Sequence, residues 1–461
     1  MPPGVEDYYN RDMAKSGNKK SRTHFYRRIQ KHFGTEPGKL KIVSCRFAPY
    51  DRPNVHLALE ALFRKPKIKA ELEGIVCEQP WDHPSFAKLS REATARQYFE
   101  APVEYMDVEV AEGKRLACVT SGVYWIRWGK QPLGLLITQS QQTHPPRITV
   151  EVIARTQDLA QDFLRELTAL VQDSPAFRGK VFSLTVDCYR EVQIQFHRLP
   201  KIAREEIVLP AQVLDRLDRH AMGFVRHGAL LKESGRHMKR GVLLHGQPGT
   251  GKTLSAMYLA ALMPGRTVMI LTGGGLSSVE STGELARALA PVTVILEDVD
   301  LIGTMREHQS VSANALLFEL LNQMDGLAED ADVLFVLTTN RPDVLEPALA
   351  SRPGRIDQAI EIPMPDDECR RRLIELYGKG LALRISDPQK LVSRTRGVSA
   401  AFIRELLRRA TLFAAEADGN GNRTAITIED AHLEAALEEL LHAGGRFTQV
   451  LLGALPASPS A

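Results

Sequence analysis

Residues 246–253, Gly-Gln-Pro-Gly-Thr-Gly-Lys-Thr, form an unbroken phosphate-loop motif of the type G-x-x-x-x-G-K-[ST]. The motif follows the apolar run 242–244 and precedes a helix-forming stretch over 254–262. This order of strand, glycine turn and helix N-terminus lets successive backbone N–H groups converge on phosphate oxygens, with the helix dipole beneath them. The motif therefore predicts a site for a nucleoside triphosphate.

Two residues of the motif have specific expected roles. The Lys252 ammonium would neutralise the β- and γ-phosphates, and the Thr253 hydroxyl would bind the Mg²⁺ that bridges them. A glycine-rich turn that binds nothing is the alternative, and the strand and helix on either side argue against it. We predict ATP and Mg²⁺ as cofactors, with these residues at the nucleotide: Gly246, Pro248, Gly249, Thr250, Gly251, Lys252, Thr253 and Leu254.

A second apolar run, residues 294–296, ends in the acidic residues Glu297 and Asp298. Acids at such a strand end can face the phosphates, where one carboxylate holds Mg²⁺ and another orients or deprotonates the attacking water. We assign Glu297, with Thr253, to the metal and Asp298 to the water. The alternative is a buried strand that is merely capped by acids.

Further polar residues follow the next strands. The apolar run 333–337 leads into Thr338, Thr339 and Asn340, and residues 350–357 present Arg352 and Arg355 on a turn. Arginines beyond the sheet suit a contact with a γ-phosphate across a subunit boundary. The predicted catalytic set is therefore Glu297, Asp298, Asn340, Arg352 and Arg355.

Composition limits the class of protein. The chain has 461 residues, 44% hydrophobic and 25% charged, which is typical of two to four globular domains. It contains no run of eighteen apolar residues and its N-terminus lacks the apolar core of a signal peptide, so we expect a cytoplasmic protein without a membrane span. The five scattered cysteines indicate neither a disulfide framework nor a zinc site.

The first 40 residues are basic, with nine Lys or Arg against four Asp or Glu. Such an arm can contact nucleic acid or an acidic surface, but a solvated arm without function is commoner. We do not predict nucleic-acid binding from it.

Residues 1–200 differ in character from the rest. Helical patterns over 24–33 and 55–63 precede alternating stretches over 103–110 and 116–128, which indicate antiparallel strands. A strand, helix, strand series follows, over 148–153, 158–171 and 180–186. We expect a separate α+β domain that recognises a protein client or partner. Tyr124, Trp125 and Trp128 could form a binding face, but the period-two spacing of Tyr124, Ile126 and Trp128 favours a half-buried sheet.

The remaining chain alternates strands with helices and then becomes helical. Strand candidates over 267–271, 292–296, 333–337 and 359–362 join the phosphate-loop strand, and this alternation predicts a parallel sheet with helices on both faces. We place this α/β nucleotide-binding domain at 201–364, a helical lid domain at 365–445 and a tail at 446–461.

Five motifs in one order resemble the classical clade of the AAA+ ATPases, which includes the proteasomal ATPases and the microtubule-severing enzymes. The resemblance covers about residues 205–440. It rests on residues 240–245 before the phosphate loop, the acidic strand end, Thr338-Thr339-Asn340-Arg341-Pro342, 352–357 and 395–401. It implies a homo-oligomeric ring, most often a hexamer, with ATP at each subunit boundary. Asn340 would then position the water, and Arg352 and Arg355 would reach the neighbour's γ-phosphate.

Two departures from the family pattern affect the mechanism. The acidic pair is usually Asp then Glu, whereas here Glu297 precedes Asp298; a misplacement of about 1 Å can cost ~100-fold in rate, so hydrolysis could be slow. The mitochondrial AAA translocase of the folded Rieske protein is similar in this order, which leaves hydrolysis open. Where the family usually has an aromatic pore loop, residues 273–280 contain no aromatic residue, which puts threading of an unfolded chain in doubt.

The sequence thus predicts an ATPase (ATP and water to ADP and phosphate) that remodels proteins as a ring, like a chaperone or unfoldase. A nucleotide-gated scaffold with minimal turnover is a second reading, and a nucleic-acid-associated remodeller is a third. The client, the subunit number and the role of the N-terminal domain are left open.

Overall fold

The computed structural model describes residues 23–79, 82–140, 147–173, 176–186, 192–236, 238, 240–272, 279–302, 331–343, 345, 356–417 and 426–443. The chain divides into two compact units. The first comprises Met1–Ala176 with Asp187–Val192, and the second comprises Phe177–Val186 with Gln193–Ala461.

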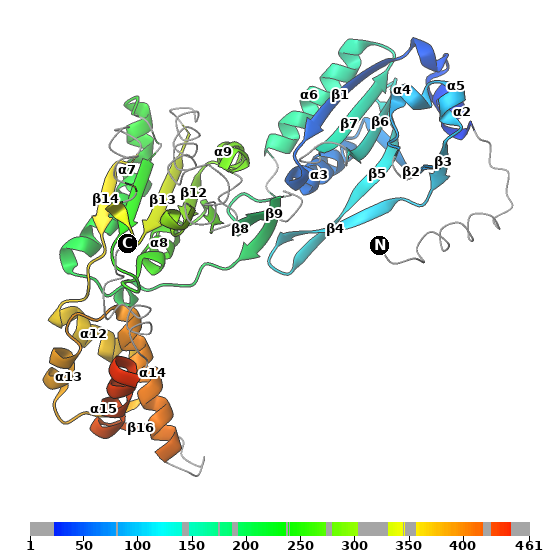
Figure 1. The fold of residues 1–461 in the computed structure, drawn as a ribbon. Coiled ribbons are helices and arrows are strands. Elements are labelled where there is room, and N and C mark those ends of the chain that lie inside the picture. Colours follow the sequence, from blue (N-terminus) through cyan, green and yellow to red (C-terminus); the bar gives the residue numbers. More distant parts are fainter. Residues whose placement is uncertain are drawn as a thin grey trace. The chain divides into compact units, whose positions relative to one another are not determined.

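The first unit is built on a seven-stranded antiparallel sheet (Figure 1). Its strands lie in the order β1-β7-β6-β5-β2-β3, and β4 pairs with β5. The strands are β1 Lys41–Phe47, β2 Ile68–Cys77, β3 Tyr98–Ala101, β4 Glu104–Ala111, β5 Lys114–Trp128, β6 Gln131–Ser140 and β7 Arg147–Ala154. The helices are α2 His24–Phe33, α3 Arg52–Phe63, α4 Phe86–Leu89, α5 Glu92–Ala95 and α6 Gln157–Asp173.

Helices cover both faces of this sheet. Alternate residues of β5 enter two separate cores: Tyr124 and Ile126 pack with α3 and α6, whereas Val123 and Trp125 pack with α2 and α4. Successive side chains of a strand point to opposite faces, so the centre of β5 keeps its period of two while its side chains are buried on both faces. The expected half-buried strand is therefore buried on both sides at its centre. The alternative of an aromatic binding face is wrong, because Tyr124 and Trp125 are buried on opposite faces.

The second unit contains a seven-stranded sheet of order β14-β10-β13-β12-β11-β8-β9. Its strands are β8 Val181–Val186, β9 Val192–His197, β10 Arg240–His245, β11 Thr267–Leu271, β12 Val292–Leu296, β13 Val333–Thr339 and β14 Gln358–Glu361. The five predicted strands pair in parallel, which confirms the α/β prediction. Helices α7 Ala211–Glu233 and α8 Lys252–Ala261 pack against the sheet through one core, and α9 Val279–Ala288 precedes β12.

The predicted domain boundary at residue 200 differs from the structure. Strand β8, expected in the N-terminal domain, pairs in parallel with β11. Phe177, Phe182 and Phe196 also form an aromatic cluster within the second unit, with ring centroids 5.9–6.0 Å apart. Sequence periodicity identifies a strand but not the sheet that it joins, because pairing between distant strands is a tertiary choice.

This boundary predicts that two fragments of the chain differ in stability. A fragment of residues 177–461 keeps β8 and β9, whereas a fragment of residues 201–461 leaves β11 as a bare sheet edge. Phe182 and Leu184 are fully buried, and burial of such a side chain stabilises by about 1.5–3 kcal/mol. We expect the shorter fragment to unfold at a clearly lower temperature, as measured by thermal unfolding of both. Equal midpoints would contradict the placement of β8.

The C-terminal part of the second unit is a bundle of helices (Figure 1). Its helices are α12 Asp367–Tyr377, α13 Pro388–Arg394, α14 Ala400–Ala417 and α15 Asp430–Glu438, continued by a π-helical turn over Glu439–Ala443. The Asp366 carboxylate caps α12 by accepting a hydrogen bond from the Cys369 amide. A short parallel pair, β15 Ala382–Arg384 and β16 Thr427–Glu429, corrects the expectation of a purely helical segment. The predicted tail, 446–461, lies outside the described residues.

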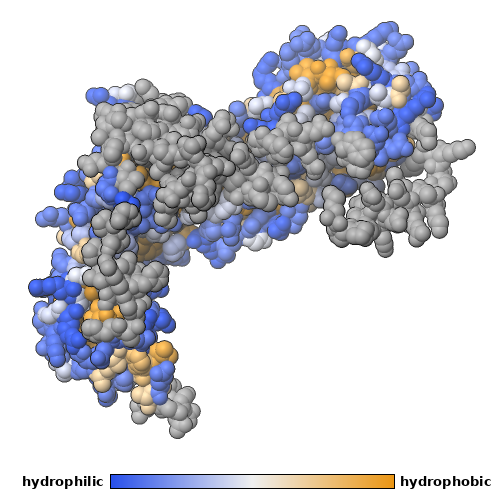
Figure 2. All heavy atoms as spheres, viewed as in Figure 1, coloured by the Kyte–Doolittle hydropathy of each residue, from blue (hydrophilic) through white to orange (hydrophobic). Residues whose placement is uncertain are grey.

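The described surface is mainly hydrophilic, with small hydrophobic areas on the face shown in Figure 2. The large apolar side chains that are exposed in the described part come from separate elements: Ile42, Val76, Tyr105, Met106, Leu230, Leu254 and Leu412. Among the described residues, no helix is both long and apolar enough to span a membrane.

Candidate nucleotide-binding site

The phosphate loop joins β10 to α8 and needs its glycines for two different reasons. Gly246 and Gly251 have positive φ values of 149° and 104°, which side chains of L-residues rarely adopt. At Gly246 a Cβ atom would also lie 2.3 Å from the Ile362 carbonyl oxygen. At Gly251 a Cβ would meet nothing within 4 Å among the described residues, so there the backbone conformation alone requires glycine.

Lys252 is the buried cation of the loop. Only 6% of the residue is exposed, and its ammonium donates to the carbonyl oxygens of Gly246 at 3.0 Å and Gln247 at 2.9 Å. Burial lowers the pKa of Lys252, and the charges of Asp298 and Asp300 oppose this by raising it. The ammonium is therefore held at the centre of the loop beside two carboxylates, where added phosphate charge would favour its protonated form.

Thr253 and Glu297 provide oxygen ligands that suit Mg²⁺. The Thr253 hydroxyl hydrogen-bonds the Glu297 side chain. Burial raises the pKa of Glu297, the Asp298 charge adds to this, and the Thr253 hydrogen bond lowers it. The Oε1 atom of Glu297 is buried and has no hydrogen-bond partner among the described residues. Because such an atom is costly unless something binds it, a hard cation that prefers oxygen fits these two residues.

Asp298 lies next to Asn340. The Asn340 Nδ2 atom donates to Asp298 Oδ1 at 3.2 Å, and the Asp298 amide donates to the Thr338 hydroxyl at 3.0 Å. Asp298 has a φ of 48°, the one positive value of a non-glycine residue in the described chain, and such a conformation costs about 1–3 kcal/mol. Burial raises the pKa of Asp298, as does Asp300, while Lys252 and Asn340 lower it. These contacts aim a carboxylate of raised proton affinity at the loop.

Asp300 fixes the end of β13. Its Oδ1 atom accepts hydrogen bonds from the Thr339 hydroxyl at 2.8 Å and from the Asn340 amide at 3.1 Å. Thr338 and Thr339 are fully buried. Asp300 thereby ties the strand that carries Asn340 to the acidic segment after β12, which sets the distance between Asn340 and Asp298.

A cavity of about 840 Å³ gathers most of the predicted residues. Eight of them line it: Pro248, Gly249, Gly251, Lys252, Thr253, Leu254, Asp298 and Asn340. Gly246 and Thr250 instead shape the loop, where the Thr250 hydroxyl donates to the Gln247 carbonyl at 2.9 Å. Glu297 is not among the residues that line the cavity. Arg352, Arg355 and residues 273–278 of the expected pore loop lie outside the described residues.

The helical bundle supplies the rest of the lining, which sequence reasoning missed. These additional residues are Met257, Tyr377, Ala400, Ala401, Arg404, Glu405 and Arg408. Met257 lies one helical turn after Thr253, so the period of α8 would have found it. Glu405 accepts both hydrogen bonds of Arg408 and one of Arg409, which holds the pKa of Glu405 at about 2. Tyr377 and Arg404 have no local signal, because only the fold brings them to a loop more than 100 residues away in sequence.

Backbone contacts join the phosphate loop to the bundle. The Ala401 amide donates to the Gly249 carbonyl oxygen at 3.1 Å. A Cβ atom at Gly249 would lie 2.7 Å from the Ser399 hydroxyl and 3.0 Å from the Ala401 Cβ, so glycine permits this close approach. A shift of the loop on binding phosphate would therefore displace the start of α14 through this hydrogen bond.

Comparison with known proteins agrees with this geometry. Residues 242–364 match the model of the "ATPase family associated with various cellular activities (AAA)". The proteasome-activating nucleotidase of Pyrococcus horikoshii is 34% identical over 218 residues, which are 45% of this chain and 53% of that protein. The corresponding protein of Thermococcus onnurineus is 32% identical over 237 residues, 49% of this chain and 58% of that protein.

A eukaryotic relative is similar over the same kind of span. The 26S proteasome regulatory subunit S10B homolog B of Arabidopsis thaliana is 34% identical over 192 residues, 39% of this chain and 48% of that protein. The chain thus spans about half the length of the curated relatives it matches. Together with the phosphate loop, Asp298 and Asn340 around one cavity, these matches show that residues 242–364 are similar to the AAA family of ATPases, proteasomal ATPases among them.

Proposed function

We propose that this chain is an ATP-hydrolysing machine that remodels proteins and works as an oligomeric ring. The observation that carries the proposal is the cavity of about 840 Å³, where the phosphate loop, Asp298 and Asn340 meet the helical bundle. A mere nucleotide-binding turn would need no carboxylate aimed at the phosphates. The relatives named proteasome-activating nucleotidases support the same reading.

The residues divide the chemistry between them. The loop amides and Lys252 bind the phosphates of ATP, while Thr253 and Glu297 hold Mg²⁺. When bound, Mg²⁺ supplies positive charge that neutralises the developing charge on the phosphate oxygens. Asp298 accepts a proton from the attacking water, and Asn340 orients that water through its amide. Preorganised groups of this kind stabilise the transition state because they need no rearrangement during the reaction.

The helical bundle acts as a lid in this proposal. The hydrogen bond from Ala401 to Gly249 gives it a direct connection to the phosphate loop. Arg404 and Tyr377 line the cavity from the bundle side, so closure over the nucleotide would change their surroundings. In this proposal, ATP hydrolysis drives a movement of the helical bundle relative to the phosphate loop.

The ring would place Arg352 and Arg355 at the neighbour's γ-phosphate, most often with six subunits. Support comes from the position of these arginines after β13 in sequence and from the resemblance to ring-forming ATPases. The family match covers residues 242–364, which lie in the second unit. We propose that the first unit recognises the protein client, and that the exposed Tyr105 and Met106 of β4 contribute to that recognition.

A mixing experiment tests hydrolysis at subunit boundaries. Lys252→Ala and Arg355→Ala proteins should each be inactive, whereas their mixture should recover part of the ATPase activity. The reason is that mixed rings contain boundaries which pair an intact phosphate loop with an intact arginine. Steady-state phosphate release measures the recovery, and a mixture of Lys252→Ala with the double variant Lys252→Ala/Arg355→Ala is the matched control.

Two results would contradict the proposal. If a mixture that is shown to co-assemble has no ATPase activity, then Arg355 does not act across the subunit boundary. Negligible turnover by the native protein, with ATP-dependent assembly intact, would instead favour the nucleotide-gated scaffold.

A further inference from the structure

A cluster of possible metal ligands lies in the first unit, far in sequence from the nucleotide cavity. It combines His24 at the start of α2, Glu73 on β2 and Glu100 on β3. One ligand atom from each lies within 4.8 Å of the others. Glu100 pairs with Ile75 across β2 and β3, and Glu73 precedes Ile75 by two residues. Both carboxylates therefore leave the same face of the sheet, the face on which α2 packs.

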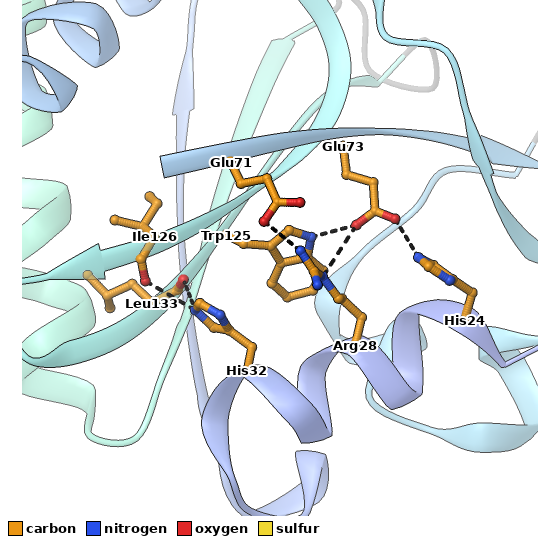
Figure 3. Close-up of polar contacts among 8 residues, drawn as sticks. All are labelled: His24, Arg28, His32, Glu71, Glu73, Trp125, Ile126 and Leu133. Atoms are coloured by element: carbon orange, nitrogen blue, oxygen red, sulfur yellow. Dashed lines mark hydrogen bonds and ion pairs between the residues drawn. The ribbon is translucent and has the colours of Figure 1, made fainter. Parts of the chain in front are cut away.

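Glu73 is already held in place by its neighbours (Figure 3). The Trp125 indole Nε1–H donates to Glu73 Oε2 at 2.6 Å, and the other carboxylate oxygen, Oε1, contacts His24 Nε2. Only 12% of the Glu73 side chain is exposed. Metal-binding carboxylates are typically fixed by such outer hydrogen bonds, which orient the remaining oxygen towards the ion.

The nearby cation is directed mainly at another acid. Arg28 donates to Glu71 Oε2 at 2.7 Å, whereas its Nε atom is 4.0 Å from Glu73 Oε2. The guanidinium also lies over the Trp125 ring, 5.7 Å from its centroid. Arg28 thus compensates Glu71. Glu73 and Glu100 place two carboxylates beside the His24 imidazole, and their oxygen and nitrogen atoms are possible ligands of a metal ion.

We propose that His24, Glu73 and Glu100 bind a divalent transition-metal ion, best matched by Zn²⁺. An imidazole nitrogen with carboxylate oxygens is a common zinc ligand set, and hard ions such as Mg²⁺ and Ca²⁺ prefer oxygen alone. Three protein ligands leave a fourth position for water. The site is independent of the nucleotide cavity and of the ATPase activity proposed above.

The geometry allows the ion to bind with small side-chain movements. With Zn²⁺ about 2.0–2.2 Å from each ligand, tetrahedral ligand atoms lie about 3.4 Å apart. All three ligand atoms lie within 4.8 Å of one another, but His24 Nε2 and Glu73 Oε1 are in hydrogen-bond contact. These two atoms therefore have to separate by roughly 1 Å to bind one ion. Glu100 is exposed and His24 is about one-third exposed, so rotation of these two side chains can close the site around the ordered Glu73. The ion would then link α2 directly to β2 and β3.

The test is a titration of the full-length, tag-free protein with Zn²⁺ in excess Mg²⁺ and without nucleotide. The native protein should bind one Zn²⁺ per chain more than either His24→Ala or Glu100→Gln. Loss of a direct ligand should weaken binding by more than the ~10–100-fold typical of outer partners. Co²⁺ in place of Zn²⁺ should give visible absorption bands with the native protein that both variants lack.

Glu71→Gln is the matched control, because it removes the same charge from the same sheet face without removing a ligand. It should retain the extra Zn²⁺ and the Co²⁺ bands. Glu100→Gln changes an exposed side chain, and circular dichroism checks that it folds. Equal Zn²⁺ stoichiometry in the native protein and in both ligand variants would overturn the proposal. So would an equal loss in Glu71→Gln, since general electrostatic attraction would then explain the binding.

Discussion

Replacing Lys252 with alanine should reduce ATP affinity on the order of 1000-fold. The ammonium is buried among the loop carbonyls of Gly246 and Gln247, and its charge also offsets Asp298 and Asp300. Two opposite charges about 4 Å apart interact by roughly 4 kcal/mol at an effective dielectric constant of 20, and each 1.4 kcal/mol is about tenfold in affinity. Removal therefore loses the attraction to phosphate and leaves two carboxylates to repel it. Equilibrium titration with Mg-ATP measures the loss.

Lys379→Ala is the control for this experiment, because it removes the same charge from an exposed position in the helical bundle. It should bind ATP like the native protein. Thermal unfolding without nucleotide shows whether each variant is folded. Unchanged ATP affinity in a folded Lys252→Ala protein would show that the phosphate loop is not the nucleotide site.

Substitutions of the two acids after β12 should have different effects on catalysis and on Mg²⁺ dependence. Asp298→Asn should leave ATP and Mg²⁺ bound but lower kcat by about 10²–10⁴-fold, the usual contribution of a general base. The amide occupies the same volume, and asparagine tolerates the positive φ of 48° at this position. Glu297→Gln should chiefly raise the Mg²⁺ concentration needed for activity, because it weakens the ligand whose Oε1 has no partner among the described residues. Steady-state ATPase assays across a Mg²⁺ series separate the two effects.

Asp300→Asn is the informative comparison, because Asp300 touches Thr339 and Asn340 rather than lining the cavity. It should lower kcat less than Asp298→Asn and leave the Mg²⁺ dependence unchanged. If Glu297→Gln instead traps ATP while Asp298→Asn turns over normally, then the two roles are reversed. That outcome would make Glu297, the first acid after β12, the general base.

The phosphate loop could be predicted from the sequence because its residues are contiguous. The glycines at 246 and 251, the lysine at 252 and the hydroxyl at 253 are contiguous, and their backbone requirements are met within one turn. Strand ends at 297–298 and 340 were also predictable, since parallel strands carry their carboxyl ends to one edge of a sheet. Of these residues, Gly251, Lys252, Thr253, Asp298 and Asn340 line one cavity. Their catalytic roles remain predictions until the variants are measured.

Only some of the helices and strands of the first unit could be predicted from the sequence. Helix α2 and the strands β4, β5 and β7 follow clear periodic patterns and were expected. The strands β1, β2 and β6 were not predicted. In β2 and β6 the alternation of apolar and polar residues is weak, and pairing with the neighbouring strands is what makes them part of the sheet. The sequence analysis also missed that the centre of β5 is buried on both faces. Alternation of apolar residues is already explained by one covered face, so it does not indicate a helix on the other face.

By itself, the sequence determined that a phosphate loop, an acidic strand end and a polar strand end would occur in one α/β domain. Those features depend on residues that are close along the chain or at the ends of parallel strands. Only the tertiary structure decided that β8 joins the ATPase sheet, that Tyr377 and Arg404 line the nucleotide cavity, and that His24, Glu73 and Glu100 meet. Each of these depends on contacts between segments distant in sequence, and such contacts are fixed by packing of the whole unit rather than by any local pattern.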